Sequence, residues 1–129
     1  GQIGAWTAHG AQLAPTASGA VTLNGSPVAL GPDWHALRKG LFADFDGDGA
    51  GDLLWRHDGG VVALWRMDGT PIDPARNGAV TFNGSAVSLP SEWRFEGADD
   101  FKNDGAADIL WRNGAGQVAL WDMNGTAID

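Results

Sequence analysis

The strongest constraint on how this chain can fold is a repeat within its 129 residues. Asp-Leu-Leu-Trp-Arg at 52–56 returns as Asp-Ile-Leu-Trp-Arg at 108–112, and Val-Ala-Leu-Trp at 62–65 returns unchanged at 118–121. Both pairs lie 56 positions apart. Repeat proteins bury the apolar faces of their small units by stacking one repeat on the next. We therefore expect the chain to consist of stacked copies of one unit.

Two further matches indicate how many copies there are. Residues 21–26 return at 80–85 with an offset of 59, and residues 1–6 match 116–121. The chain thus begins and ends at nearly the same phase of the repeat, with two full periods and one extra strand. We expect a single repeat domain. Its parts are a partial blade at 1–34, a first full repeat at 35–93 and a partial second repeat at 94–129.

Each period is expected to contain about four short strands. Glycine-rich turns allow the positive φ angles that tight hairpins need, and no stretch has the 3.6-residue apolar period of a helix. This pattern predicts an all-β fold with one small antiparallel sheet per repeat, of the kind that stacks radially as β-propeller-type blades. The strands expected in the first copy are 35–43, 52–56, 61–67 and a fourth at 21–30, folded or bent at Asn24 and Gly25.

Two blades cannot close the ring of a propeller, and the sequence leaves three ways to resolve this. The chain belongs to a longer protein, or several copies assemble, or the two sheets pack as a small sandwich. In the second case the extra terminal strand would complete the sheet of a neighbouring copy, and a homo-oligomer would close the ring.

The charge of the chain excludes several classes of partner. The net charge is -8 and the pI is about 4.5, which argues against nucleic acid and against an anionic membrane surface. No apolar run approaches the length of a membrane span, so we expect no membrane insertion. There is no cysteine, and fourteen of the sixteen acidic residues are aspartate, which is favoured in turns and short metal loops.

The sharpest motif is the first acidic loop, residues 44–52. Gly49 at loop position 6 permits a sharp turn, and calcium prefers six to eight hard oxygen ligands. The flanks are expected to be strands and position 12 is Trp55, so the loop is not an EF-hand. The spacing predicts a Ca²⁺ site. Its expected ligands are the carboxylates at positions 1, 3, 5 and 9 and one carbonyl: Asp44, Asp46, Asp48, Asp52 and Ala50.

The second acidic loop, residues 100–108, departs from this pattern. Lys102 stands at position 3, and a protonated lysine cannot coordinate calcium. Two outcomes are open. The loop binds calcium weakly through Asp100, Asp104 and Asp108 with water, or the Lys102 ammonium takes the place of the metal.

These motifs resemble the FG-GAP/VCBS-type repeat. The resemblance covers almost the whole chain and rests on Asp-Phe-Asp-Gly-Asp-Gly-x-x-Asp followed by Leu-Leu-Trp-Arg at 44–56. It implies blades of a β-propeller, as in integrin α-subunits, fungal propeller lectins and secreted bacterial proteins. It also implies that the loop between the first two strands of each blade holds calcium. An extracellular or cell-surface location, with a glycan or an extracellular protein as ligand, is the corresponding expectation.

The tryptophans are expected to serve mainly in packing, because each repeat buries the same positions. Trp34 and Trp93 are the candidates for a ligand-binding role, since both follow a strand end beside polar residues. Aromatic rings in loops can stack on the apolar face of a sugar. The alternative is that these two rings fill the space between blades.

No catalytic motif is present, and we expect a binding module and not an enzyme. Three functions remain open. The first is a lectin-like, carbohydrate-binding unit, and the second is an adhesive module. The third is a self-assembling repeat unit in which calcium only stabilises loops.

Overall fold

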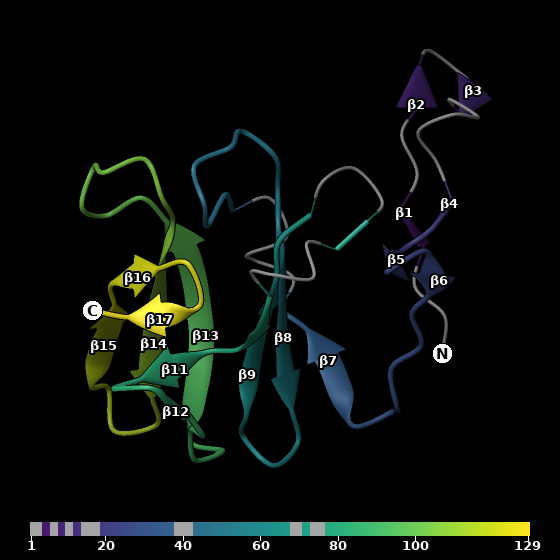
Figure 1. Cartoon of the computed structure of the whole chain (residues 1–129). Helices are drawn as coiled ribbons and strands as arrows, with labels where there is room; N and C mark the ends of the chain where they lie inside the picture. Colours follow the sequence, from purple (N-terminus) through teal and green to yellow (C-terminus); the bar gives the residue numbers. More distant parts are fainter. Residues whose placement is uncertain are drawn as a thin grey trace.

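The computed structural model describes residues 4–5, 8–9, 12–13, 19–37, 43–67, 71–72 and 77–129. All regular structure in this part of the chain is β, which confirms the predicted all-β fold (Figure 1). None of the described residues forms a helix with the length and apolar character needed to cross a membrane.

The first-repeat sheet has four antiparallel strands in the order β10-β9-β8-β7. The pairing of β7 with β8 continues one residue past the end of β7, where the Leu37 N–H donates to the Leu54 carbonyl at 2.9 Å. The bounds of the strands are Trp34–Ala36 for β7, Leu53–His57 for β8, Val62–Trp65 for β9 and Gly78–Ala79 for β10.

The second-repeat sheet contains three antiparallel strands in the order β13-β14-β15. Its first strand is longer than the matching β7, and its pairing with β14 shifts register between Phe95 and Gly97. The bounds are Trp93–Asp99 for β13, Asp108–Asn113 for β14 and Val118–Trp121 for β15.

The remaining strands are two residues long. β1 pairs with β4, β2 with β3 and β5 with β6, while a second four-stranded sheet has the order β12-β11-β17-β16. β11 and β17 run parallel, and a single parallel bridge between Thr22 and Pro71 repeats this contact in the first copy. The bounds are Gly4–Ala5 (β1), Ala8–His9 (β2), Gln12–Leu13 (β3), Gly19–Ala20 (β4), Thr22–Leu23 (β5), Ser26–Pro27 (β6), Thr81–Phe82 (β11), Ser85–Ala86 (β12), Met123–Asn124 (β16) and Ala127–Ile128 (β17).

The 21–30 segment folds at Asn24 and Gly25 as predicted, but the prediction that it supplies the fourth strand of the first-repeat sheet is wrong. Asn24 and Gly25 both have positive φ, 50° and 79°, so the chain folds back on itself there as a two-residue hairpin, β5–β6. The fourth strand of the first-repeat sheet is instead β10, which precedes the matching hairpin of the second copy. The other strand predictions lie within a few residues of β7, β8 and β9, with 38–42 outside the described residues.

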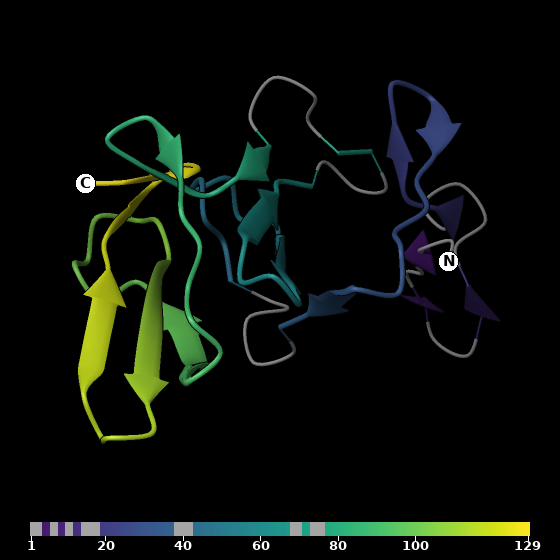
Figure 2. The ribbon, with the colours of Figure 1, turned by 90° about the horizontal axis from the view of Figure 1, so that it is seen from below.

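The main core lies where the first-repeat and second-repeat sheets face each other (Figures 1 and 2). Leu54 and Leu64 of the first sheet and Ile109 and Trp111 of the second are fully buried in one cluster. A smaller cluster of Val21, Met67 and Ile72 lies between the N-terminal part and the first sheet. The two repeats are therefore stacked, as the sequence pattern predicts, and none of the sheets in the described residues closes into a ring.

Candidate metal centre

The first acidic loop directly precedes β8 in the chain. Hydrogen bonds from its own backbone N–H groups to Asp44 hold its conformation. Asp44 Oδ1 accepts hydrogen bonds from the N–H groups of Asp46, Gly47 and Asp48 at 3.3, 2.7 and 3.2 Å. Its Oδ2 accepts from the Gly49 N–H at 2.8 Å. Partial burial acts to raise the pKa of Asp44, but these four N–H groups together lower it below its ordinary value. Asp44 is thereby held ionised at the start of the loop.

Three of the predicted ligands come together in this loop. Asp44, Asp46 and Asp48 each offer a carboxylate oxygen, and these oxygens lie within 4.8 Å of one another. Oxygen ligands at calcium distance from one ion lie no more than about 5 Å apart, so the spacing fits a single calcium ion. Among the described residues, no other group of three histidine or acidic side chains meets this distance. The loop could hold a metal ion through these three carboxylates.

Asp52, the fourth predicted carboxylate, lies buried beneath the loop. Its Oδ2 accepts from the Phe45 N–H at 2.8 Å and its Oδ1 from the Met67 N–H at 3.0 Å, and the residue has no exposed surface. The Asp52 carboxylate therefore ties the acidic loop to the end of β9. Ala50 lies in the exposed turn, where its N–H donates to Asp48 Oδ1 at 2.7 Å. The roles of Asp52 and of the Ala50 carbonyl as ligands stay predictions.

The buried Asp52 predicts how stability depends on pH without calcium. Burial raises the pKa of Asp52 from 3.8 to about 6, against the lowering effect of its two backbone N–H bonds. A carboxyl that holds its proton more tightly when folded stabilises the fold at low pH and loses that contribution as the pH rises. From this group we expect the free energy of unfolding to fall by up to about 3 kcal/mol between pH 3.8 and pH 6.

Urea unfolding at a series of pH values, in buffer with a chelator, measures this effect. The matched control is Asp52→Asn, which has no proton to release and should lack this part of the pH slope. If the free energy of unfolding depends on pH in the same way in both proteins, folding does not raise the pKa of Asp52.

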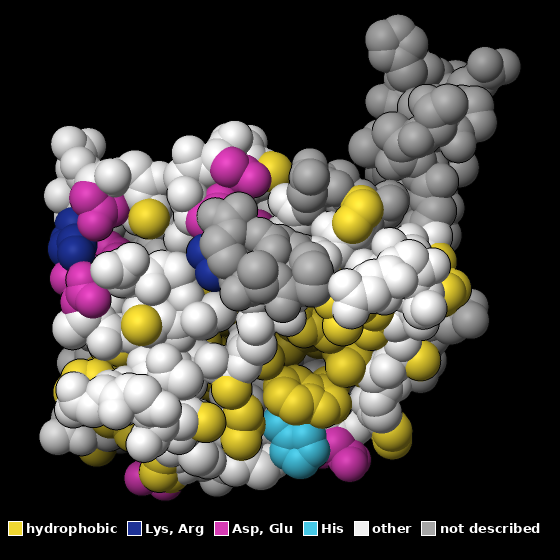
Figure 3. Space-filling view, viewed as in Figure 1, with side chains coloured by type: hydrophobic (Ala, Val, Ile, Leu, Met, Phe, Trp, Pro, Cys, Tyr) yellow, Lys and Arg dark blue, Asp and Glu magenta, His cyan; other side chains and the backbone are white. Residues whose placement is uncertain are grey.

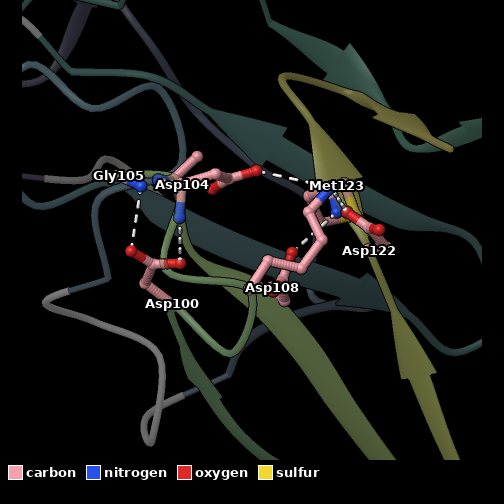
Figure 4. A network of polar contacts seen from close by, with 8 residues as sticks. Asp100, Asp104, Gly105, Asp108, Asp122 and Met123 are labelled. Carbon is pink, nitrogen blue, oxygen red and sulfur yellow. Dashed lines mark hydrogen bonds and ion pairs between the residues drawn. The ribbon is translucent and has the colours of Figure 1, made fainter.

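The second acidic loop has the same turn but a different charge distribution (Figure 4). Asp100 accepts from the N–H groups of Asp104 and Gly105 at 3.0 and 2.9 Å. Lys102 Nζ pairs with Asp104 Oδ2 at 3.3 Å and with Asp122 Oδ1. The bond to Asp122, partly offset by desolvation and supported by Asp104, raises the pKa of Lys102. Lys102 is thus paired with one predicted ligand of this loop, Asp104, and with Asp122 outside the loop, and both predicted outcomes stay predictions.

Asp108 is the counterpart of Asp52 and is equally buried. Its Oδ1 accepts from the Met123 N–H at 2.9 Å, the same contact that Asp52 makes with Met67 (Figure 4). Its Oδ2 is buried without a hydrogen-bond partner. The position 9 aspartate thus anchors the backbone two residues beyond the third strand, β9 or β15, in both repeats.

The two acidic loops lie next to each other at the junction of the repeats. The Ala107 N–H donates to the Asp44 carbonyl at 2.7 Å. Gly47, at φ 75°, comes so close to the Gly105 carbonyl that an added Cβ would lie 3.0 Å from that oxygen. A hollow of about 380 Å³ between the loops is lined in part by Asp44 and Asp100. A cation in the first loop would therefore act at the contact between repeats.

Trp34 and Trp93 do not form one site. Trp93 packs against the main core, and its carbonyl accepts a hydrogen bond from Arg56. Trp34 is partly exposed and makes an edge contact with His57, with ring centroids 5.0 Å apart. Trp34 lines a separate hollow. Trp93 instead packs against the core between the two repeats.

Sequence reasoning missed Asp122, the main partner of Lys102. Asp122 stands where the first copy has Arg66, and this exchange is the signal that could have revealed it. The lysine at position 3 of the second loop is accompanied by a new carboxylate just past β15. The two changes compensate each other in charge.

Comparison with models of known protein families, with curated protein sequences and with solved structures finds no match to this chain. The resemblance to FG-GAP/VCBS-type repeats therefore rests on the residues of the chain itself.

Proposed function

We propose that this chain is a calcium-binding module of propeller-type β-repeats whose first acidic loop holds the ion. The observation that carries the proposal is the group of three carboxylates, Asp44, Asp46 and Asp48, with oxygens within 4.8 Å of one another. The resemblance of residues 44–56 to FG-GAP/VCBS-type repeats supports the same assignment. Because the repeats that the chain resembles occur in secreted and cell-surface proteins, we also propose an extracellular or cell-surface location.

The role of the ion would be structural. Three carboxylates held this close repel one another, and a divalent cation removes that repulsion. Because the Asp44 carbonyl accepts the Ala107 N–H of the second repeat, ordering the first loop also orders the junction. The module would then present its surface for binding and would carry out no reaction.

Thermal unfolding with calcium and with a chelator tests this proposal. At a calcium concentration 100-fold above Kd, one site stabilises the fold by about 3 kcal/mol, or on the order of 10 °C in Tm. Asp46→Ala should abolish this shift, because it removes one of the three carboxylates of the group. The matched control Asp33→Ala, at an exposed aspartate outside the loops, should keep it. If calcium still raises the Tm of Asp46→Ala by the same amount, the ion binds outside this group of carboxylates.

Lys102 offers a gain-of-function prediction. Lys102→Asp restores a carboxylate at position 3 of the second loop and removes the ammonium that pairs with Asp104 and Asp122. We expect this variant to bind one calcium ion more per chain than the wild type. Terbium luminescence, excited through the tryptophans, counts the sites. An unchanged count would mean that Lys102 is not what prevents binding there.

A second candidate function is recognition of a glycan at Trp34. Trp34 is partly exposed, and it lines an apolar hollow of about 310 Å³ together with Trp55 and Trp65. Such rings could stack on sugar faces. A glycan array followed by calorimetry tests this function. Binding that Trp34→Ala removes, with folding intact, would support it, and the absence of binding to any glycan would leave the calcium-dependent module without this ligand.

A further inference from the structure

Asparagine followed directly by glycine occurs five times in the chain. In this dipeptide the backbone nitrogen of the glycine can attack the side-chain carbonyl carbon of the asparagine, because no Cβ on the glycine obstructs the approach. The fold decides which of these pairs can react, since the asparagine side chain must be free to turn toward the next backbone nitrogen. The five pairs are Asn24-Gly25, Asn77-Gly78, Asn83-Gly84, Asn113-Gly114 and Asn124-Gly125.

Asn83 and Gly84 form the tip of the β11–β12 hairpin. Phe82 pairs with Ser85, so these two residues are the whole loop. Both have positive φ, 50° and 77°, as a tight two-residue turn requires, and both are exposed. The hairpin lies on the face shown in Figure 3, toward the lower left, where the surface consists mainly of backbone and uncharged polar side chains.

Both reacting groups at this tip are without hydrogen-bond partners. Within residues 77–129 and the other described segments, the Asn83 side chain makes no hydrogen bond and the Gly84 N–H has no acceptor. A Cβ placed on Gly84 would meet no atom within 4 Å. Neither a partner nor a neighbouring side chain therefore restricts the amide of Asn83.

The same dipeptide at Asn113 and Gly114 is held in place. Asn113 Oδ1 accepts from the N–H groups of Ala115 and Gln117 at 3.1 and 2.9 Å, and its Nδ2 donates to Gln117 Oε1. Asn113 is also only partly exposed, in the turn between β14 and β15. Its side chain can turn toward the Gly114 nitrogen only after these three hydrogen bonds break. The chain thus contains one open and one restrained copy of the same reactive pair.

We propose that Asn83 is a site of spontaneous deamidation in the folded protein. The Gly84 nitrogen loses its proton and forms a bond to Asn83 Cγ, and the side-chain amide leaves as ammonia. Water then opens the resulting succinimide ring at either carbonyl and gives aspartate or isoaspartate. The net change consumes one water, releases one ammonia and adds one negative charge to the hairpin.

The tip of a hairpin is also the kind of segment that can reach the reactive geometry. Ring closure needs the backbone at Asn83 to rotate, and short exposed turns with few contacts open locally at low cost in free energy. The isoaspartate product carries the main chain through the former side chain and lengthens a two-residue loop by one methylene. We expect the pairing of Phe82 with Ser85 to be disturbed in that product.

The first repeat has a second open pair at Asn24 and Gly25. These residues form the tip of the β5–β6 hairpin with φ of 50° and 79°, and both are exposed. A Cβ on Gly25 would meet no atom within 4 Å, as at Gly84. Asn24 should therefore react at a rate close to that of Asn83, which gives one such site in each of the two matching hairpins.

Peptide mapping by mass spectrometry during incubation in mildly alkaline buffer tests the proposal. The replacement of NH₂ by OH raises the mass of the modified peptide, and the rate should increase with pH because the attacking nitrogen must lose its proton. We expect deamidation at Asn83 to be at least about tenfold faster than at Asn113, because three hydrogen bonds restrain the latter. In urea above the unfolding transition the two rates should approach each other, since only the fold distinguishes the sites.

Gly84→Ala is the variant that tests the attacking group. Its Cβ stands beside the nitrogen, so deamidation at Asn83 should slow while the rate at Asn24 stays unchanged and serves as the internal control. Equal rates at Asn83 and Asn113 in the folded protein would overturn the proposal. The same holds if Asn83 stays intact in the folded protein and reacts only in urea.

Discussion

Trp111→Ala is expected to destabilise the protein by about 3–5 kcal/mol, a larger loss than we expect from any other single substitution. The Trp111 side chain is fully buried between the two sheets. It makes ring contacts with Phe95 and Trp121, with centroids 5.7 and 5.0 Å apart, and it receives the Arg56 guanidinium on its face. Its removal leaves a cavity at the junction that the surrounding strands can fill only in part.

Trp55→Ala is the matched control, because Trp55 occupies the same position in the first repeat. It contacts Trp65 at 5.1 Å, but one side of it faces the open hollow. We expect Trp55→Ala to lower the free energy of unfolding by about 2 kcal/mol, since fewer side chains pack against Trp55 than against Trp111. Chemical unfolding of both variants at low protein concentration gives the two values. Equal losses would mean that the junction contributes no more than the packing within one repeat.

Arg56→Ala is expected to destabilise the protein by about 2–4 kcal/mol. The substitution removes the donors to three backbone carbonyls of the 89–93 segment and the cation over Trp111. Burial lowers the pKa of Arg56 below its ordinary value, but the group remains charged at neutral pH. Arg56→Lys should restore only part of the stability, because a single ammonium cannot reproduce the fork of the guanidinium.

Arg112→Ala is the matched control for this second effect. Arg112 has the same position in the second repeat but lies at the surface, so its removal should change monomer stability by less than about 0.5 kcal/mol. Urea unfolding of Arg56→Ala and Arg112→Ala under dilute conditions measures the contrast. Two equally small values would show that Arg56 does not hold the repeats together.

The all-β fold and the stacking of repeats could be predicted because they depend on local patterns. The glycine-rich turns, the alternating strands and the spacing of 56 between matching segments are visible in the sequence. The partner of the 21–30 segment could not be predicted, because pairing between distant strands depends on the whole arrangement. The positive φ at Asn24 and Gly25 makes a hairpin there, and the first-repeat sheet takes its fourth strand from Gly78–Ala79 instead.

The candidate site could be predicted in part for a similar reason. The spacing of aspartates places Asp44, Asp46 and Asp48 in one group, because a short loop alone brings them together. The same spacing gives no sign that Asp52 lies beneath the loop, bonded to the N–H of Met67 at the end of another strand. The pairing of Lys102 with Asp122 likewise depends on a contact between separate segments.

Calorimetric titration of the chelator-treated protein with calcium tests the central claim most directly. We predict one site per chain in the wild type, held by the first acidic loop, and no binding at that site in Asp46→Ala. Two sites in the wild type would show that Lys102 leaves the second loop when calcium is present. No binding at all would contradict the claim that the Asp44, Asp46 and Asp48 carboxylates form a metal site.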